Sequence, residues 1–175
     1  NVNECIGAEE VSVSTVQLVD HSIIDSIVSD ASYSPSWKNT QITRYIAIED
    51  LSILETIAEQ FTPDYNSNII KQIPVLIAVT FVKGRCGFER DGSYTTKRKT
   101  AGRCLMWSSL SDILSFGKRP RAWNVIMGVF EEDGITETAA DSDDQELAAL
   151  IALGYPDIDP EAPKRKTTDI LLQYR

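Results

Sequence analysis

The chain has 175 residues, 42% of them hydrophobic, and carries a formal net charge of −9 with a pI near 4.6. This length and apolar content suit one globular domain covering residues 1–175, with a sizeable core. The acidic balance argues against a nucleic-acid partner held by phosphate attraction, and the longest apolar run, residues 73–82, is too short to span a bilayer.

The first predicted elements are a helix and a strand joined by a polar loop. Apolar residues at 23, 24, 27, 28 and 31 have helical spacing, and Asp20 suits the N-cap. Residues 33–41 are rich in turn formers and predict a loop. Residues 42–49, rich in isoleucine and tyrosine, predict a strand.

A second helix and a buried strand are predicted next. Apolar residues from Leu51 to Phe61 form a helical stripe, which Pro63 should end. Residues 74–82 are almost uninterruptedly apolar, as in a strand buried on both faces. Residues 145–153 suit either a helix or a buried strand. Helices mixed with non-adjacent strands favour an α+β domain.

Most familiar catalytic and metal-binding patterns are missing. The one histidine, His21, lies at a predicted helix start and suits a solvated or capping role better than catalysis. Cys5, Cys86 and Cys104 lack metal or redox spacing, and the acidic residues at 141–144 lack the pattern of a calcium loop. We therefore name no metal ligand, and we expect reduced thiols in a cytoplasmic protein without a visible secretory signal.

Two polar segments have both an ordinary and a functional interpretation. Residues 33–41 surround Pro35 with serine and amide side chains, which suit a turn but also offer hydrogen bonds to a polar, planar ligand. The basic triplet at 164–166 suits a solvated tail. In an extended segment, however, Lys164 and Lys166 would point the same way and could hold one phosphate group.

Four passages in order give the chain a resemblance to the FMN-dependent nitroreductase family. They are Ser34-Pro35-Ser36-x-x-Asn39-x-Gln41, Ile73-Pro74-Val75-Leu76-Ile77, residues 125–130 and residues 149–156. The resemblance implies a nitroreductase-like mixed sheet flanked by helices, assembled as an intertwined homodimer with FMN at the dimer interface. It also implies a strand for residues 149–154.

The resemblance implies that this chain binds FMN. The expected FMN-binding residues are Pro35, Ser36, Asn39, Gln41, Met127, Gly128, Lys164 and Lys166. In the implied reaction, NADH or NADPH is the co-substrate that donates hydride, and a nitroaromatic, quinone or similar small molecule accepts the electrons. The cofactor carries this chemistry, so we name no catalytic side chain.

The chain departs from the family at its start, where Glu9 and Glu10 stand near the place of an Arg-x-Ser-x-Arg phosphate motif. Codons shifted by one nucleotide permit that motif here, and other shifts permit family-like text further on. We hypothesise that residues 1–19, 97–124 and 138–142 are out-of-frame text.

Two other functions fit the sequence. One is a flavin-binding sensor or binding protein of the same fold without turnover. The other is a nucleic-acid or acidic-partner binder that uses the basic runs at 97–99, 119–121 and 164–166.

Overall fold

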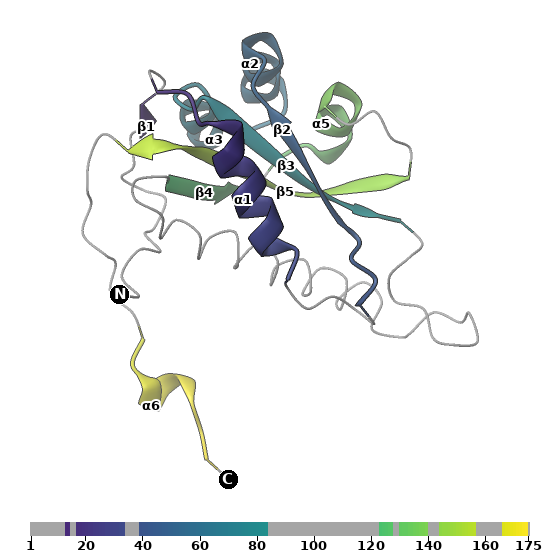
Figure 1. Ribbon diagram of the computed structural model, residues 1–175. Helices are drawn as coiled ribbons and strands as arrows, with labels where there is room; N and C mark the ends of the chain where they lie inside the picture. Colours follow the sequence, from purple (N-terminus) through teal and green to yellow (C-terminus); the bar gives the residue numbers. More distant parts are fainter. Residues whose placement is uncertain are drawn as a thin grey trace.

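The computed structural model describes residues 13–14, 17–33, 39–83, 123–127, 130–139, 144–156 and 166–174 (Figure 1). The strands are β1 (Val13–Ser14), β2 (Thr43–Ile48), β3 (Val75–Val82), β4 (Trp123–Met127) and β5 (Gln145–Pro156). The helices are α1 (His21–Ala31), α2 (Leu51–Gln60), α3 (Asp64–Ile70), α5 (Glu132–Ala139) and α6 (Thr168–Leu171). No helix in this described part is long and apolar enough to cross a membrane.

The strands form one antiparallel sheet organised around β5. β3 pairs with β5 from Val75 opposite Leu153 to Val82 opposite Gln145, and β2 pairs with β3. β4 pairs with residues 150–154 of β5, while β1 pairs with its last two residues. Within the described residues, β2 has a strand neighbour on one side only, so it is an edge strand.

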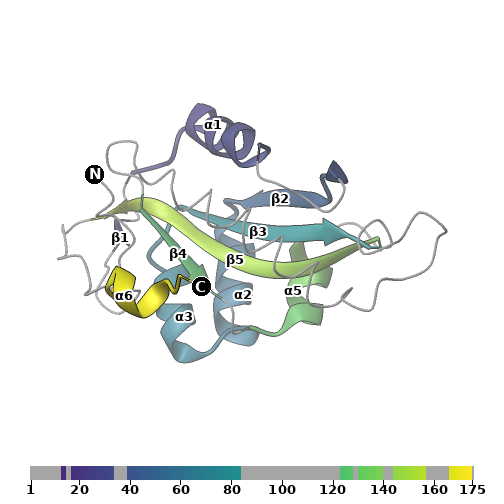
Figure 2. The same ribbon diagram turned by 90° about the horizontal axis from the view of Figure 1, so that it is seen from below.

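The helices cover both faces of the sheet. Figure 2 shows α1 on one face and α2, α3 and α5 on the other. The α1-side core comprises Val19, Ile24, Ile27, Ala31, Val75, Ile77, Val79, Ala149, Ile151 and Leu153. The opposite core includes Leu54, Ile57, Ile70, Leu76, Met127, Ile135, Leu150 and Ala152. Successive strand residues point to opposite faces, which explains why β3 and β5 are apolar at nearly every position.

A β-bulge in β5 keeps apolar residues directed at the cores. Val79 pairs with Ala149, but the next residue of β3, Thr80, pairs with Leu147, so Ala148 is the extra residue. Without it, Leu147 would point to the α1 side, whereas it is buried in the core with α2 and α5. Thr80 is fully buried, and its hydroxyl donates to the side-chain oxygen of Gln145.

Aspartate side chains cap the first two helices. Asp20 accepts a hydrogen bond from the Ser22 amide at 2.7 Å, and Asp50 accepts from the amides of Ser52 and Ile53 at 2.8 and 3.2 Å. The side-chain hydrogen bond from Ser52 lowers the pKa of Asp50, helped by the two amide bonds. These caps fix where each helix begins relative to the sheet.

The structure confirms the α+β class and most of the predicted elements. α1 begins after Asp20, β2 and β3 lie within the predicted strands, and α2 ends three residues before Pro63. Residues 149–154 are strand, as the resemblance implied, but the strand begins already at Gln145. The sequence interpretation missed the helices α3, α5 and α6 and the strands β1 and β4. Most of the residues hypothesised to be out of frame lie outside the described residues, and that hypothesis stays untested.

The first prediction concerns the close contact between α2 and α5. A Cβ on Gly134 would lie 2.2 Å from Cε1 of Phe61, and the Glu131 amide donates to the Phe61 carbonyl at 2.7 Å. We expect Gly134→Ala to lower the free energy of unfolding by about 1–3 kcal/mol through overpacking, despite alanine's better helix propensity. Phe61→Leu should relieve part of that loss in the double variant, measured by denaturant titration. A Gly134→Ala protein more stable than wild type would contradict this packing.

The second prediction concerns the ion pair between His21 and Glu49, whose Nε2 and Oε2 atoms are 2.9 Å apart. This hydrogen bond, together with the Glu49 charge, raises the pKa of His21 above its ordinary value of 6.5. The interaction therefore stabilises the fold below pH 6.5 and is lost as pH rises through the raised value. Because His21 is the sole histidine, NMR titration of its ring protons is unambiguous. Glu49→Gln should return the pKa toward 6.5; no change would contradict the ion pair.

Candidate functional site

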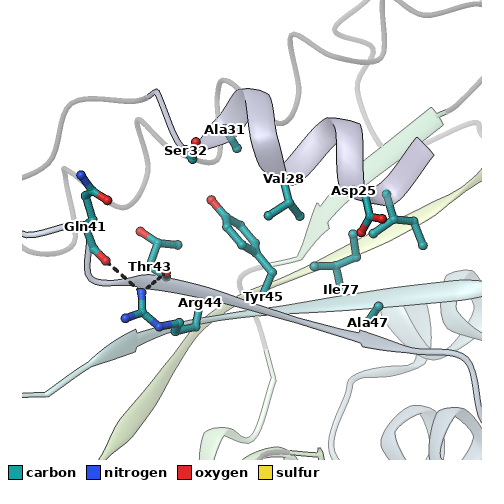
Figure 3. A pocket seen from close by; sticks show the side chains of 11 residues that line it. Asp25, Val28, Ala31, Ser32, Gln41, Thr43, Arg44, Tyr45, Ala47 and Ile77 are labelled. Carbon is teal, nitrogen blue, oxygen red and sulfur yellow. Dashed lines mark hydrogen bonds between the residues drawn. The ribbon is translucent and has the colours of Figure 1, made fainter. Parts of the chain in front are cut away.

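The candidate site is a cavity of about 550 Å³ between α1 and the edge strand β2 (Figure 3). Its volume lies within the range typical of small-molecule sites, about 300–1,000 Å³. It is lined by Ile24, Asp25, Val28, Ala31, Ser32, Gln41, Thr43, Arg44, Tyr45, Ala47 and Ile77. Helix α1 supplies one wall, and the sheet supplies the other.

Strand periodicity explains the chemistry of the sheet wall. Thr43, Tyr45 and Ala47 alternate along β2 and share the face that looks toward α1, so the Tyr45 ring lies between strand and helix (Figure 3). Ile77, on the neighbouring strand β3, is buried beneath them. The walls are therefore mainly apolar, with hydroxyl groups from Thr43, Tyr45 and Ser32.

The loop that closes one end of the cavity contains two residues with left-handed backbone. Asn39 has a φ of 55° and Gln41 a φ of 48°. Residues other than glycine rarely adopt this left-handed region, and asparagine is among those that adopt it most often. The Gln41 side-chain amide donates to Asn39 Oδ1 at 3.2 Å. Such backbone strain concentrates at ligand sites, because the surrounding structure must hold it in place.

Arg44 lies beside the same loop, with its side chain on the face of β2 opposite to Thr43 and Tyr45 (Figure 3). Its Nη1 donates to the backbone carbonyls of Gln41 at 2.9 Å and Thr43 at 2.8 Å. These bonds hold the guanidinium beside the strained loop. The ion pairs found among the described residues join other side chains, His21 with Glu49 and Lys71 with Glu59, so no carboxylate there neutralises Arg44.

Asp25 is the charged residue of the helix wall and lies toward the other end of the cavity (Figure 3). It precedes Ser32 by seven residues, which corresponds to about 10 Å along a helix. The guanidinium of Arg44 lies toward the opposite end, on the side of β2 that faces away from α1 (Figure 3). No group of three or more metal-ligating side chains gathers in the described part of the chain.

The structure covers half of the FMN-binding residues expected from the sequence. Pro35, Ser36, Gly128 and Lys164 lie outside the described residues. Asn39 and Gln41 are joined by their side-chain hydrogen bond, and Gln41 lines the cavity.

Met127 and Lys166 do not lie at this cavity within one chain. Met127 is buried in the core on the opposite face of the sheet. Lys166 is exposed, two residues before α6, and in both Figures 1 and 2 α6 lies well away from the start of β2.

Sequence reasoning missed the walls of the cavity and the position of Arg44. In the sequence, Ile24, Val28 and Ala31 have the spacing of an ordinary buried helix face. The spacing of apolar residues does not distinguish Val28, which lines the cavity, from Ile27, which is buried in the core. It also missed Asn66, a polar side chain of α3 that is 7% exposed. For Arg44, the only signal in the sequence was its closeness to Gln41, three residues earlier.

Comparisons with known proteins find the same fold in solved structures. No family model matches the chain, and no curated protein matches it by sequence. A nitroreductase family protein from Streptococcus pneumoniae superposes with a TM-score of 0.82 at 15% identity, covering 95% of this chain and 96% of that one.

Two further similar structures are named for FMN or were solved with it. A protein from Staphylococcus epidermidis, provisionally named an NAD(P)H:FMN oxidoreductase, has a TM-score of 0.79 at 15% identity, covering 95% of this chain and 91% of that one. A provisionally assigned nitroreductase from Desulfovibrio desulfuricans, solved in complex with FMN, has a TM-score of 0.69 at 20% identity, covering 94% and 91%. At these identities the likeness is one of fold, and the chain has the fold of the nitroreductase family.

Proposed function

We propose that the protein is an FMN-dependent oxidoreductase that passes hydride from NADH or NADPH, by way of the flavin, to a nitroaromatic, quinone or similar acceptor. The observation that carries the proposal is the agreement in fold over nearly the whole chain with nitroreductase family proteins, one relative of that fold being bound to FMN. The strained Asn39–Gln41 loop supports it, because the sequence resemblance assigns this loop to the flavin.

The donors of the described residues fit FMN chemically. The amides of Asn39 and Gln41 offer both N–H donors and carbonyl acceptors, which match the mixed donor and acceptor edge of a flavin ring. Lys166 offers a cation for the phosphate and is exposed, without an ion pair among the described residues. When bound, FMN would supply the ability to take up hydride and release electrons.

The protein's own part is to bind and orient. Held by the Arg44 bonds to the Gln41 and Thr43 carbonyls, the loop keeps its amides in one arrangement before any ligand arrives. Such preorganisation reduces the ordering cost of binding. The apolar walls of α1 and β2 would exclude water beside the ring.

We also propose that the working protein is a homodimer. The C-terminal tail, residues 168–174, exposes large apolar side chains: Ile170 is 64% exposed, Leu171 68%, Leu172 46% and Tyr174 91%. A cluster of this kind marks an interaction surface. Because α6 lies away from Asn39 and Gln41 in one chain, a second copy could bring a Lys166 to the loop and complete the flavin site.

The third prediction tests the cofactor and the reaction. We expect the purified protein to be yellow with bound FMN, and NADH or NADPH to bleach that colour without oxygen. Lys166→Gln should weaken FMN binding about tenfold, as expected for a charged hydrogen bond. Lys71→Gln removes the same charge from a lysine paired with Glu59 at 3.0 Å and should leave FMN affinity unchanged.

The outcomes of this test separate the proposed functions. A colourless protein that takes up no added FMN would rule out the flavin proposal. A yellow protein that neither nicotinamide bleaches would point to the sensor of the same fold.

The fourth prediction tests the dimer with a matched pair of variants. Replacing Ile170 and Leu171 by serine should shift the mass in light scattering from two chains toward one and should weaken FMN binding with it. The control replaces Leu18 and Leu51 by serine. These residues are 80% and 72% exposed and lie outside the tail, so the change should alter neither the mass nor the FMN affinity. A tail variant that keeps the wild-type mass would show that the tail does not hold the dimer.

A further inference from the structure

We propose that the ion pair between His21 and Glu49 is a pH-sensitive latch, which holds α1 against β2 at one end of the cavity and slows the exchange of a bound ligand. The loop before β2, with Gln41, lies at the other end (Figure 3). The latch itself is inferred from the geometry of α1 and β2. That the ligand is FMN rests, in addition, on the proposed function.

The ion pair lies where the two walls of the cavity end. On α1, His21 lies one helical turn before Asp25 and on the same face, and Asp25 lines the cavity. On the sheet side, the lining residues alternate along β2 as far as Ala47, and Glu49 is the next residue in that alternation. Asp25 and Ala47 lie at the same end of the cavity (Figure 3). The distances from His21 Nε2 to Glu49 Oε2 and Oε1 are 2.9 and 3.2 Å, so this contact joins helix and strand just beyond that end.

The core supports α1 more firmly over β3 and β5 than over β2. Ile27 and Ala31 of α1 are buried in one cluster with side chains of β3 and β5. Toward β2, Val28 and Tyr45 are only half-buried and Ala47 is exposed, because the cavity lies between helix and strand. A contact that ties α1 to the end of β2 therefore acts on the side of the helix where apolar packing is incomplete.

The protonation of His21 determines the strength of this contact. Glu49 raises the pKa of His21 through its hydrogen bond and its charge, and this outweighs the effect of partial desolvation. Asp20 and Asp25, the other charged groups that act on the ring, are also carboxylates and raise the pKa further. The latch is therefore strongest below pH 6.5, and it loosens as the pH rises through the raised pKa and the ring becomes neutral.

The test measures the rate at which FMN leaves the full-length protein, from the recovery of flavin fluorescence after dilution at a series of pH values. Glu49→Gln removes the charge that holds His21, so its FMN release should be about threefold faster than that of the wild type at about pH 5.5. The effect is modest because the two side chains are 77% and 42% exposed. The ratio of the two rates should fall toward one as the pH rises through the pKa of His21. This ratio is the observable because the phosphate of FMN itself titrates at about pH 6 in both proteins.

Two further variants separate the latch from a general effect of charge. His21→Gln should also release FMN faster, and the double variant should release it no faster than either single variant, because both changes remove one contact. The control is Glu59→Gln, which breaks the exposed ion pair between Lys71 and Glu59 on the face of the sheet opposite to α1. Its rate of FMN release should equal that of the wild type at every pH.

A second readout needs no FMN. Amide hydrogen exchange of the unliganded protein, corrected for the intrinsic effect of pH, compares peptides from α1 with peptides from α3, which lies on the opposite face of the sheet (Figure 2). At about pH 5.5, His21→Gln should lower the protection of α1 about threefold and leave that of α3 unchanged. A pair that contributed only to global stability would change both helices equally.

The outcomes decide between the latch and its alternatives. A ratio of FMN release rates that stays at one at low pH, or an equal loss of protection in α1 and α3, overturns the proposal. A ratio above one that does not change with pH overturns its pH dependence. A protein that takes up no FMN would contradict the proposed function, and the hydrogen exchange of α1 would still decide the latch.

Discussion

The structure depends on the pairing of β3 with β5, two strands buried on both faces. Their apolar side chains alternate between the core beneath α1 and the core beneath α2, α3 and α5, and nearly every one is less than 9% exposed. Burying one such side chain is worth about 1.5–3 kcal/mol, so this pair supplies much of the driving force for folding. The bulge at Ala148 shows how strongly both faces are specified, because an uninterrupted register would turn Leu147 to the other face.

The residues of the candidate site lie at the edge of the sheet and not in its buried centre. β2 is an edge strand in the described part of the chain. A cavity lies between its residues 43–47 and α1. There the loop residues Asn39 and Gln41 adopt backbone angles that cost free energy, and Arg44 ties their segment to the strand. Strain of this kind persists only when neighbouring structure holds it, and the Arg44 bonds to the Gln41 and Thr43 carbonyls are contacts of that kind.

Among the described residues, one chain does not bring together the flavin-binding residues that the sequence suggested. Asn39 is hydrogen-bonded to Gln41, which lines the cavity, whereas Met127 contributes its side chain to the opposite core. Lys166 precedes a tail whose apolar residues face solvent. The homodimer that we propose would account for both the exposed apolar groups and the separation of these residues. In that account, the association of subunits and the binding of FMN are coupled steps, and each stabilises the other by mass action.

The sequence by itself determined the α+β class, the helix starting after Asp20, the strands β2 and β3, and the polar loop before β2, because periodicity, capping and turn chemistry are local. It did not reveal α3 and α5, whose short apolar patterns give weak signals, nor choose strand over helix for β5 without the family resemblance. Only the tertiary structure decided that Val28 lines a cavity while Ile27 fills the core, and that the Arg44 guanidinium bonds to the Gln41 carbonyl. Both outcomes depend on how α1 packs across β2, and that packing joins residues far apart in the chain.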